Sequence, residues 1–244
     1  MVEAPFPLQV LAADELADRL VAGSAALFPT DTVPALAACP GAAAQLWQLK
    51  QRPARKPMIL MGADAEALFA ALGQPIAPQW RAMAERCWPG AVTLVLPARG
   101  ALAQALHGEV DGEGASLGLR IPACPEALAL LRRSGPLATT SANRSHEPPC
   151  RTAEAAAALF AAIPLLGPLP WPGGSGQPST VLAWTWAEEQ ARTESEGGGA
   201  AQRAAAELGA RPAAADATSV AGGAGRWQIL RSGALMPVDL LSGG

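Results

Sequence analysis

Two polar groups early in the chain have the residue types and spacing needed to bind a phosphate. Thr30, Asp31 and Thr32 follow an apolar run that ends at Phe28. A cationic group comes later, and both lysines of the whole sequence belong to it: Lys50, Arg52, Arg55 and Lys56. An ammonium is a movable point charge, whereas a guanidinium is a rigid fork that matches phosphate or carboxylate oxygens. The pattern therefore predicts a phosphate-binding site.

The backbone around these cations is predicted to point two of them the same way. Residues 41–49 are rich in alanine with interspersed apolar residues, which predicts a short helix. Pro53 disfavours helical backbone at Arg52, so the helix is expected to stop near Lys50. In an extended segment Lys50 and Arg52 would share a face, because they lie two residues apart. The alternative is a solvated basic loop at a helix end, where cations also favour the helix dipole.

A second polar pair follows an apolar strand expected at residues 137–140. Ser141 and Asn143 also lie two residues apart, so an extended backbone would present a hydroxyl and an amide to the same ligand. Ser-Ala-Asn is equally a common exit from a strand into a turn, in which the side chains bond their own backbone. From these residues alone, the strand exit is the favoured interpretation.

The composition is typical of a protein of the reducing cytoplasm. The 244 residues, half of them hydrophobic, suffice for one large domain or two small ones. No apolar run approaches the roughly 18 residues of a membrane span, and the N-terminus does not resemble a secretory signal. Four cysteines without a C-x-x-C pair and two histidines argue against structural zinc and a disulfide framework. A formal charge of −3 gives no general attraction to nucleic acid.

Periodicity and turn residues predict alternating strands and helices. Strands are expected at residues 7–10, 25–29, 58–61, 92–96, 116–122, 137–140, 179–182 and 227–231. Helices are expected at 12–22, 41–49, 63–72, 80–87, 125–133 and 152–160, with Asp14 and Thr152 as caps. Residues 187–225 hold few large apolar residues and predict a flexible insertion with one marginal helix at 200–208.

These elements carry seven short motifs in an order that resembles the YrdC/Sua5 family. The motifs are PTDTV, KQRP, WPGAVTLVL, LGLRIP, TTSAN with PPCRT, PSTV and ILRSGAL. Members of this family are threonylcarbamoyl-AMP synthases, nucleotidyltransferases that make the first intermediate of N6-threonylcarbamoyladenosine in tRNA. The match covers about residues 8–188 and 226–237. It resembles the short form of the family, without the separate C-terminal domain of the longer Sua5 type.

The resemblance implies a single α/β domain at residues 8–237, interrupted by the insertion at about 187–225. It implies a twisted mixed parallel and antiparallel sheet, surrounding helices and a large concave cleft. Residues implied to face ATP are Lys50, Arg52, Ser141, Asn143 and Arg231, of which Lys50 and Arg52 would be catalytic. Residues implied to face L-threonine are Thr30, Thr32, Arg120, Thr140 and Ser179. Bicarbonate is the third substrate, and Mg²⁺ would arrive with ATP rather than on protein ligands. The threonylcarbamoyl transferase machinery, and through it tRNA, would be the partners downstream.

Two departures from the family pattern alter the expected pocket. Pro34 stands where the family usually has tyrosine, and Ser145 is followed by His146 where a glycine is usual. The insertion at residues 187–225 is interpreted as a loop without a role in the site rather than as a lid, because its sequence offers no residues that could anchor it.

Two other functions remain open at this stage. One is binding of double-stranded RNA, or ribosome maturation, through the same cleft, although the acidic balance weighs against it. The other is a carbamoyl-phosphate-using domain like those of hydrogenase maturation proteins. Those proteins are much longer and carry zinc-finger-like and acyl-phosphatase segments that this sequence does not contain.

Overall fold

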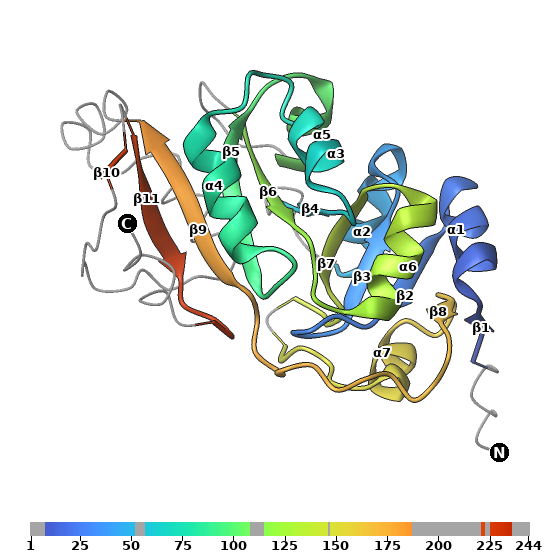
Figure 1. The fold of residues 1–244 in the computed structure, drawn as a ribbon. Helices are drawn as coiled ribbons and strands as arrows, with labels where there is room; N and C mark the ends of the chain where they lie inside the picture. The colour runs from blue at the N-terminus through green and yellow to red at the C-terminus, as the bar shows by residue number, and fades with distance from the viewer. Residues whose placement is uncertain are drawn as a thin grey trace, which may run out of the picture.

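The computed structural model describes residues 8–51, 57–107, 115–145, 147–186, 221–222 and 225–235 (Figure 1). Its strands are β1 (Val10–Leu11), β2 (Ala25–Phe28), β3 (Ala35–Ala38), β4 (Ile59–Met61), β5 (Val92–Ala98), β6 (Ala115–Arg120), β7 (Leu137–Ser141), β8 (Leu165–Leu166), β9 (Thr180–Trp186), β10 (Ala221–Gly222) and β11 (Gly225–Arg231). Its α-helices are α1 (Ala13–Val21), α2 (Ala44–Leu49), α3 (Ala65–Ala70), α4 (Pro78–Cys87), α5 (Ala101–His107), α6 (Pro125–Ser134) and α7 (Ala153–Leu159), and a 3-10 turn, η1 (Pro40–Ala42), precedes α2.

In this part of the chain, all the strands form one mixed sheet. The spatial order is β1-β8-β2-β3-β7-β4-β6-β5-β9-β11-β10. β4 pairs with β6, and β5 with β9, in parallel, whereas β7 pairs with both β3 and β4 in antiparallel register. Strands distant in sequence are therefore neighbours in the middle of the sheet. The predicted α/β class, a mixed sheet with surrounding helices, is confirmed.

Alternate residues of the central strands supply cores on the two faces of the sheet. In β2, Leu27 contributes to the larger core, which includes residues of α4 and α7, and Phe28 to the core beneath α1 and α6. Neighbouring residues point to opposite faces because side chains alternate along a strand. Since both faces of the sheet are covered here, β2 and β3 are buried throughout. Leu16 and Leu20 of α1 are fully buried on the second face, as their spacing predicts.

Three tryptophans join α4 to the antiparallel pair of β9 and β11. Trp80 of α4 is 1% exposed, and its ring lies 6.4 Å from that of Trp184 in an edge arrangement. Trp184 in turn lies 5.3 Å from Trp227 on β11, also edge to face. Such aromatic pairs stabilise beyond their buried area by about 0.5–1.5 kcal/mol. This contact anchors the two strands whose ends carry Ser179 and Arg231.

Most predicted elements are present, with boundaries shifted by a few residues. Thr152 caps α7, because its hydroxyl accepts a hydrogen bond from the Ala155 amide at 3.2 Å. The prediction that Asp14 caps α1 is wrong: Asp14 lies inside the first turn, where it pairs with Arg133 on α6. The sequence did not predict β3, β8, β10 or α5, and β10 lies within the stretch that was predicted to be a flexible insertion. β3 reads Ala-Leu-Ala-Ala and lacks the β-branched residues that signal a strand.

Several predictions fall outside the described residues. They concern Arg52, His146, the marginal helix at 200–208 and most of the insertion. Within the described ranges, no helix combines the length and apolar character needed to cross a membrane.

Asp64 at the start of α3 provides a test of local stability. Its carboxylate accepts a hydrogen bond from the Ala67 amide at 2.8 Å and so satisfies one of the open donors of the first turn. Asp64→Ala is expected to lower the free energy of unfolding by about 1 kcal/mol, measured by urea denaturation. Asp64→Asn keeps a capping oxygen and is the matched control. Equal losses in both variants would show that the cap is not the cause.

Candidate functional site

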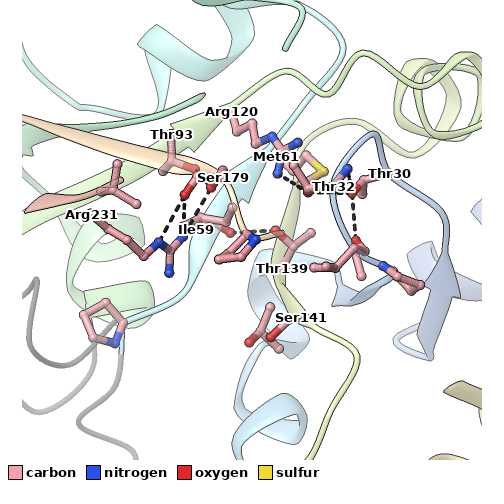
Figure 2. Close-up of a pocket in the computed structure, with 17 residues that line it drawn as sticks. Thr30, Thr32, Ile59, Met61, Thr93, Arg120, Thr139, Ser141, Ser179 and Arg231 are labelled. Atoms are coloured by element: carbon pink, nitrogen blue, oxygen red, sulfur yellow. Dashed lines mark hydrogen bonds between the residues drawn. The ribbon is translucent and has the colours of Figure 1, made fainter. Parts of the chain in front are cut away.

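A pocket opens where the ends of several central strands meet the turn after β2 (Figure 2). Including the part open to solvent, it holds about 700 Å³ of empty space. Figure 2 shows Thr30 and Thr32 on one side, Ser179 and Arg231 on the opposite side, and Ser141 below. Its lining residues are Thr30, Thr32, Val33, Pro34, Ala35, Pro57, Ile59, Met61, Thr93, Arg120, Thr139, Thr140, Ser141, Pro178, Ser179, Val181 and Arg231.

The turn between β2 and β3 holds its two threonine hydroxyls in fixed places. Thr30 Oγ1 donates to the Val33 carbonyl at 2.7 Å and accepts from the Thr32 amide at 3.1 Å. The two hydroxyl oxygens lie 2.9 Å apart, and both residues are buried. Such side-chain bonds to a local backbone are characteristic of threonine in tight turns. They explain why the hydroxyls stay ordered at the pocket wall.

Arg120, at the end of β6, is fixed against this turn by three hydrogen bonds. Its Nη1 donates to Thr32 Oγ1 at 2.8 Å, and its Nη2 to Asp31 Oδ1 at 2.7 Å. Its Nε donates to the Gly90 carbonyl at 3.0 Å. Burial lowers the pKa of Arg120, and the charge of Asp31 opposes that shift. A guanidinium has five N–H groups, so the described partners leave two available to a ligand.

The opposite wall combines β5, β9 and β11. Thr93 Oγ1 and Ser179 Oγ lie 2.8 Å apart, and Arg231 donates from Nε and Nη2 to the Ser179 carbonyl at 3.1 and 2.9 Å. Burial, followed by the positive charge of Arg120, lowers the pKa of Arg231 to about 10. Arg231 therefore remains charged at neutral pH, and its guanidinium at the pocket wall favours anions.

Thr93 is a pocket residue that the sequence reasoning missed. It is 1% exposed and belongs to β5, whose other residues from Val92 to Leu96 are aliphatic. A single hydroxyl in a buried aliphatic strand was the signal that could have found it, because a buried hydroxyl requires a partner.

Lys50, Ser141 and Asn143 form the third part of the site. Lys50 follows the last residue of α2, as predicted, and is 3% exposed. Its Nζ donates to the Ser141 carbonyl at 2.5 Å and to Asn143 Oδ1 at 3.1 Å. Ser141 Oγ donates to the same Oδ1 at 2.5 Å, while Asn143 Nδ2 donates to the carbonyls of Arg144 and Glu147. Asn143 therefore bonds to its own local backbone, as expected for a strand that exits into a turn. Ser141 instead lines the pocket.

The predicted site residues are largely brought together. Those that line the pocket are Thr30, Thr32, Arg120, Thr140, Ser141, Ser179 and Arg231. Lys50 and Asn143 contact Ser141 without belonging to the lining, and Arg52 lies outside the described residues. Pro34 is part of the wall, and its carbonyl accepts a hydrogen bond from the Ala142 amide at 2.8 Å. Among the described residues, no three His, Cys, Asp or Glu side chains gather in a way that would hold a metal ion.

Comparison with known proteins finds several similar sequences and structures. A threonylcarbamoyl-AMP synthase of Nitrosococcus oceani is 39% identical over 56% of this chain and 74% of its own length. One of Shigella flexneri is 37% identical over 57% of this chain and 74% of its own. The crystal structure of P. abyssi Sua5 complexed with L-threonine matches with a TM-score of 0.63 and 30% identity, over 70% of this chain and 50% of that chain. The model of the Sua5/YciO/YrdC family, described as "Telomere recombination", matches residues 18–193. Because that match spans most of the sequence, the chain belongs to the Sua5/YciO/YrdC family.

Proposed function

We propose that this protein is an L-threonylcarbamoyladenylate synthase, which converts L-threonine, bicarbonate and ATP into threonylcarbamoyl-AMP and pyrophosphate. The observation that carries the proposal is the pocket itself. It joins a threonine-rich wall with Arg120 to a second wall with Arg231, and Ser141 lies below both. The relatives named threonylcarbamoyl-AMP synthases support the same activity.

The wall of Thr30, Thr32 and Arg120 is the proposed amino-acid side. The two remaining N–H groups of Arg120 suit a carboxylate, which a planar guanidinium binds in a bidentate manner. The hydroxyls of Thr30 and Thr32 lie at this wall, and Thr32 Oγ1 keeps acceptor capacity for a polar group of threonine. Thr140 of β7, and Ser179 on the opposite wall just before β9, are the other proposed contacts of the amino acid.

The turn after β7 is the proposed nucleotide side. Ser141 presents its hydroxyl to the pocket, and Asn143 and Lys50 hold the turn from behind. Arg231 faces the same space from β11. Arg52 is included among the proposed nucleotide-binding residues only because it lies two residues after Lys50 in the sequence.

The reaction needs charge stabilisation rather than a protein nucleophile. The amine of L-threonine and bicarbonate form a carbamate with loss of water. A carbamate oxygen then forms a bond to the α-phosphorus of ATP, and the bond from that phosphorus to the pyrophosphate oxygen breaks. Negative charge is carried by the oxygens around this phosphorus in the transition state, so nearby fixed cations lower the barrier. Lys50, Arg52 and Arg231 would supply this field, and the pocket would hold the reactants in line.

A magnesium ion fits this site as a companion of ATP. The described residues offer no cluster of metal ligands, and the Asp31 carboxylate already pairs with Arg120. The phosphates would therefore hold the ion, which would neutralise part of their charge. The product would pass to the machinery that modifies tRNA, and we accordingly place the protein in the cytoplasm, where tRNA is found.

The first prediction concerns the reaction. With ATP, bicarbonate and Mg²⁺, pyrophosphate release is expected to require L-threonine and to be much slower with L-serine. A coupled pyrophosphate assay measures this directly. Release that is the same without any amino acid, or no release from folded protein that binds ATP, would contradict the proposal.

Replacement of Arg120 tests the amino-acid side. Arg120→Lys keeps a positive charge near Asp31 but loses the planar fork, so the KM for L-threonine is expected to rise by about 10–100-fold. The KM for ATP is expected to stay unchanged. Steady-state pyrophosphate release with each substrate varied in turn separates the two. Equal rises in both values would mean that the pocket is assigned incorrectly.

Replacement of Lys50 tests the nucleotide side. Lys50→Met keeps the length of the buried stem but removes the ammonium that Ser141 and Asn143 accept from. The kcat/KM for ATP is expected to fall by about 10–100-fold, because a charge-assisted hydrogen bond and the local field are lost. Arg133→Met removes an exposed cation on α6 and is the matched control. Wild-type kinetics in Lys50→Met would remove this residue from the site.

A further inference from the structure

The loop between β8 and β9 holds the threonine-rich turn from outside the pocket. This loop follows Leu166 and leads to Ser179 and β9 (Figure 1). The Ser175 amide donates to the Asp31 carbonyl at 3.0 Å, and the Gly176 amide donates to the Thr32 carbonyl at 2.9 Å. Two carbonyls of the turn are thus fixed by the loop. The hydroxyls of Thr30 and Thr32 are on the pocket wall (Figure 2).

Gly174 lies where any side chain would collide with that turn. A Cβ atom added there would approach the Thr32 carbonyl oxygen, lie 2.7 Å from the Thr30 carbonyl oxygen and lie 2.8 Å from the Thr32 carbonyl carbon. These are backbone atoms, which cannot rotate away as the end of a flexible side chain can. The φ of Gly174 lies outside the left-handed range, so the glycine is required by space rather than by backbone conformation. Either the loop or the turn would have to shift to admit a methyl group.

A shift of the turn would reach Arg120 directly. Thr32 Oγ1 and Asp31 Oδ1 accept two of the three hydrogen bonds that the guanidinium makes with described residues. Moving the turn therefore moves both the hydroxyls and the acceptors that orient Arg120. Lys50, Ser141 and Asn143 are bonded to one another at the end of β7 and do not take part in these contacts.

We propose that Gly174 is a positioning residue for the amino-acid substrate: its lack of a side chain sets the distance between the β8–β9 loop and the Thr30–Thr32 turn. The proposal rests on the function proposed above and adds a determinant of affinity for the amino acid that lies outside the pocket lining. It predicts that a single methyl group at residue 174 impairs the threonine side and spares the nucleotide side.

The neighbouring glycine provides a matched control. Gly173 is also exposed, and a Cβ added there would meet nothing within 4 Å. Gly174→Ala is expected to raise the KM for L-threonine by about 10–100-fold, the scale of a displacement near 1 Å at a binding site. The KM for ATP is expected to stay unchanged, and Gly173→Ala is expected to behave as wild type. Pyrophosphate release measures both constants, and thermal unfolding by circular dichroism checks that each variant is folded.

A second variant covers the case in which Gly174→Ala does not fold. Ser175→Pro replaces the amide hydrogen that is donated to the Asp31 carbonyl with the ring Cδ, so it breaks this contact between loop and turn and is expected to raise the KM for L-threonine in the same selective way. An unchanged threonine KM in either folded variant, or an equal rise for ATP, would overturn the proposal.

A crystal structure of Gly174→Ala separates this inference from the proposed function. The Thr30–Thr32 turn is expected to move relative to Ser141, whether or not the wild-type protein releases pyrophosphate. A turn that superimposes on the wild-type position would refute the positioning role by itself. Absence of threonine-dependent release in the wild-type protein would instead refute the proposed function.

Discussion

The burial of the Arg120 guanidinium is the constraint on which the rest of the pocket depends. Its side chain is 4% exposed, and a buried charge costs several kcal/mol unless it is paired and hydrogen-bonded. Its partners come from two separate segments: Asp31 and Thr32 in the turn after β2, and Gly90 in the turn before β5. The ends of β2, β5 and β6 must therefore meet at one point. Loss of a partner from such a buried pair typically costs about 3–5 kcal/mol.

The pocket consists of contacts between residues that are far apart in sequence. Arg120 and Thr32 are separated by 88 positions, Lys50 and Asn143 by 93, and Thr93 and Ser179 by 86. The strand order produces these pairs, because β7 lies between β3 and β4, and β9 lies beside β5. Contacts of this kind form only after long chain segments have been ordered. The site is therefore a property of the completed sheet rather than of any local segment.

Local charge explains how an acidic chain can present a site for anions. The formal charge of the sequence is −3, yet two arginines, Arg120 and Arg231, line the pocket. The Asp31 carboxylate does not belong to the lining and pairs with Arg120. Inside a pocket with low-dielectric walls, nearby fixed charges outweigh distant surface charges, which salt screens. A compact cationic pocket suits small anions such as a carboxylate or a nucleotide. It differs from the extended basic surface that duplex RNA requires.

The sequence by itself determined most element types, the fold class and the polar residues of the pocket wall other than Thr93 and Thr139. Apolar periodicity placed β5, β6 and β9, and the Thr152 cap and the end of α2 at Lys50 followed from local rules. Only the tertiary structure decided that β3, an alanine-rich segment with weak strand propensity, lies between β2 and β7. It also decided that Asp14 pairs with Arg133 instead of capping its helix, that Lys50 turns toward Ser141 and Asn143, and that Gly174 abuts the turn at Thr30. The physical reason is that propensity and capping depend on neighbours a few residues away, whereas these contacts depend on strand order and on close packing between distant segments.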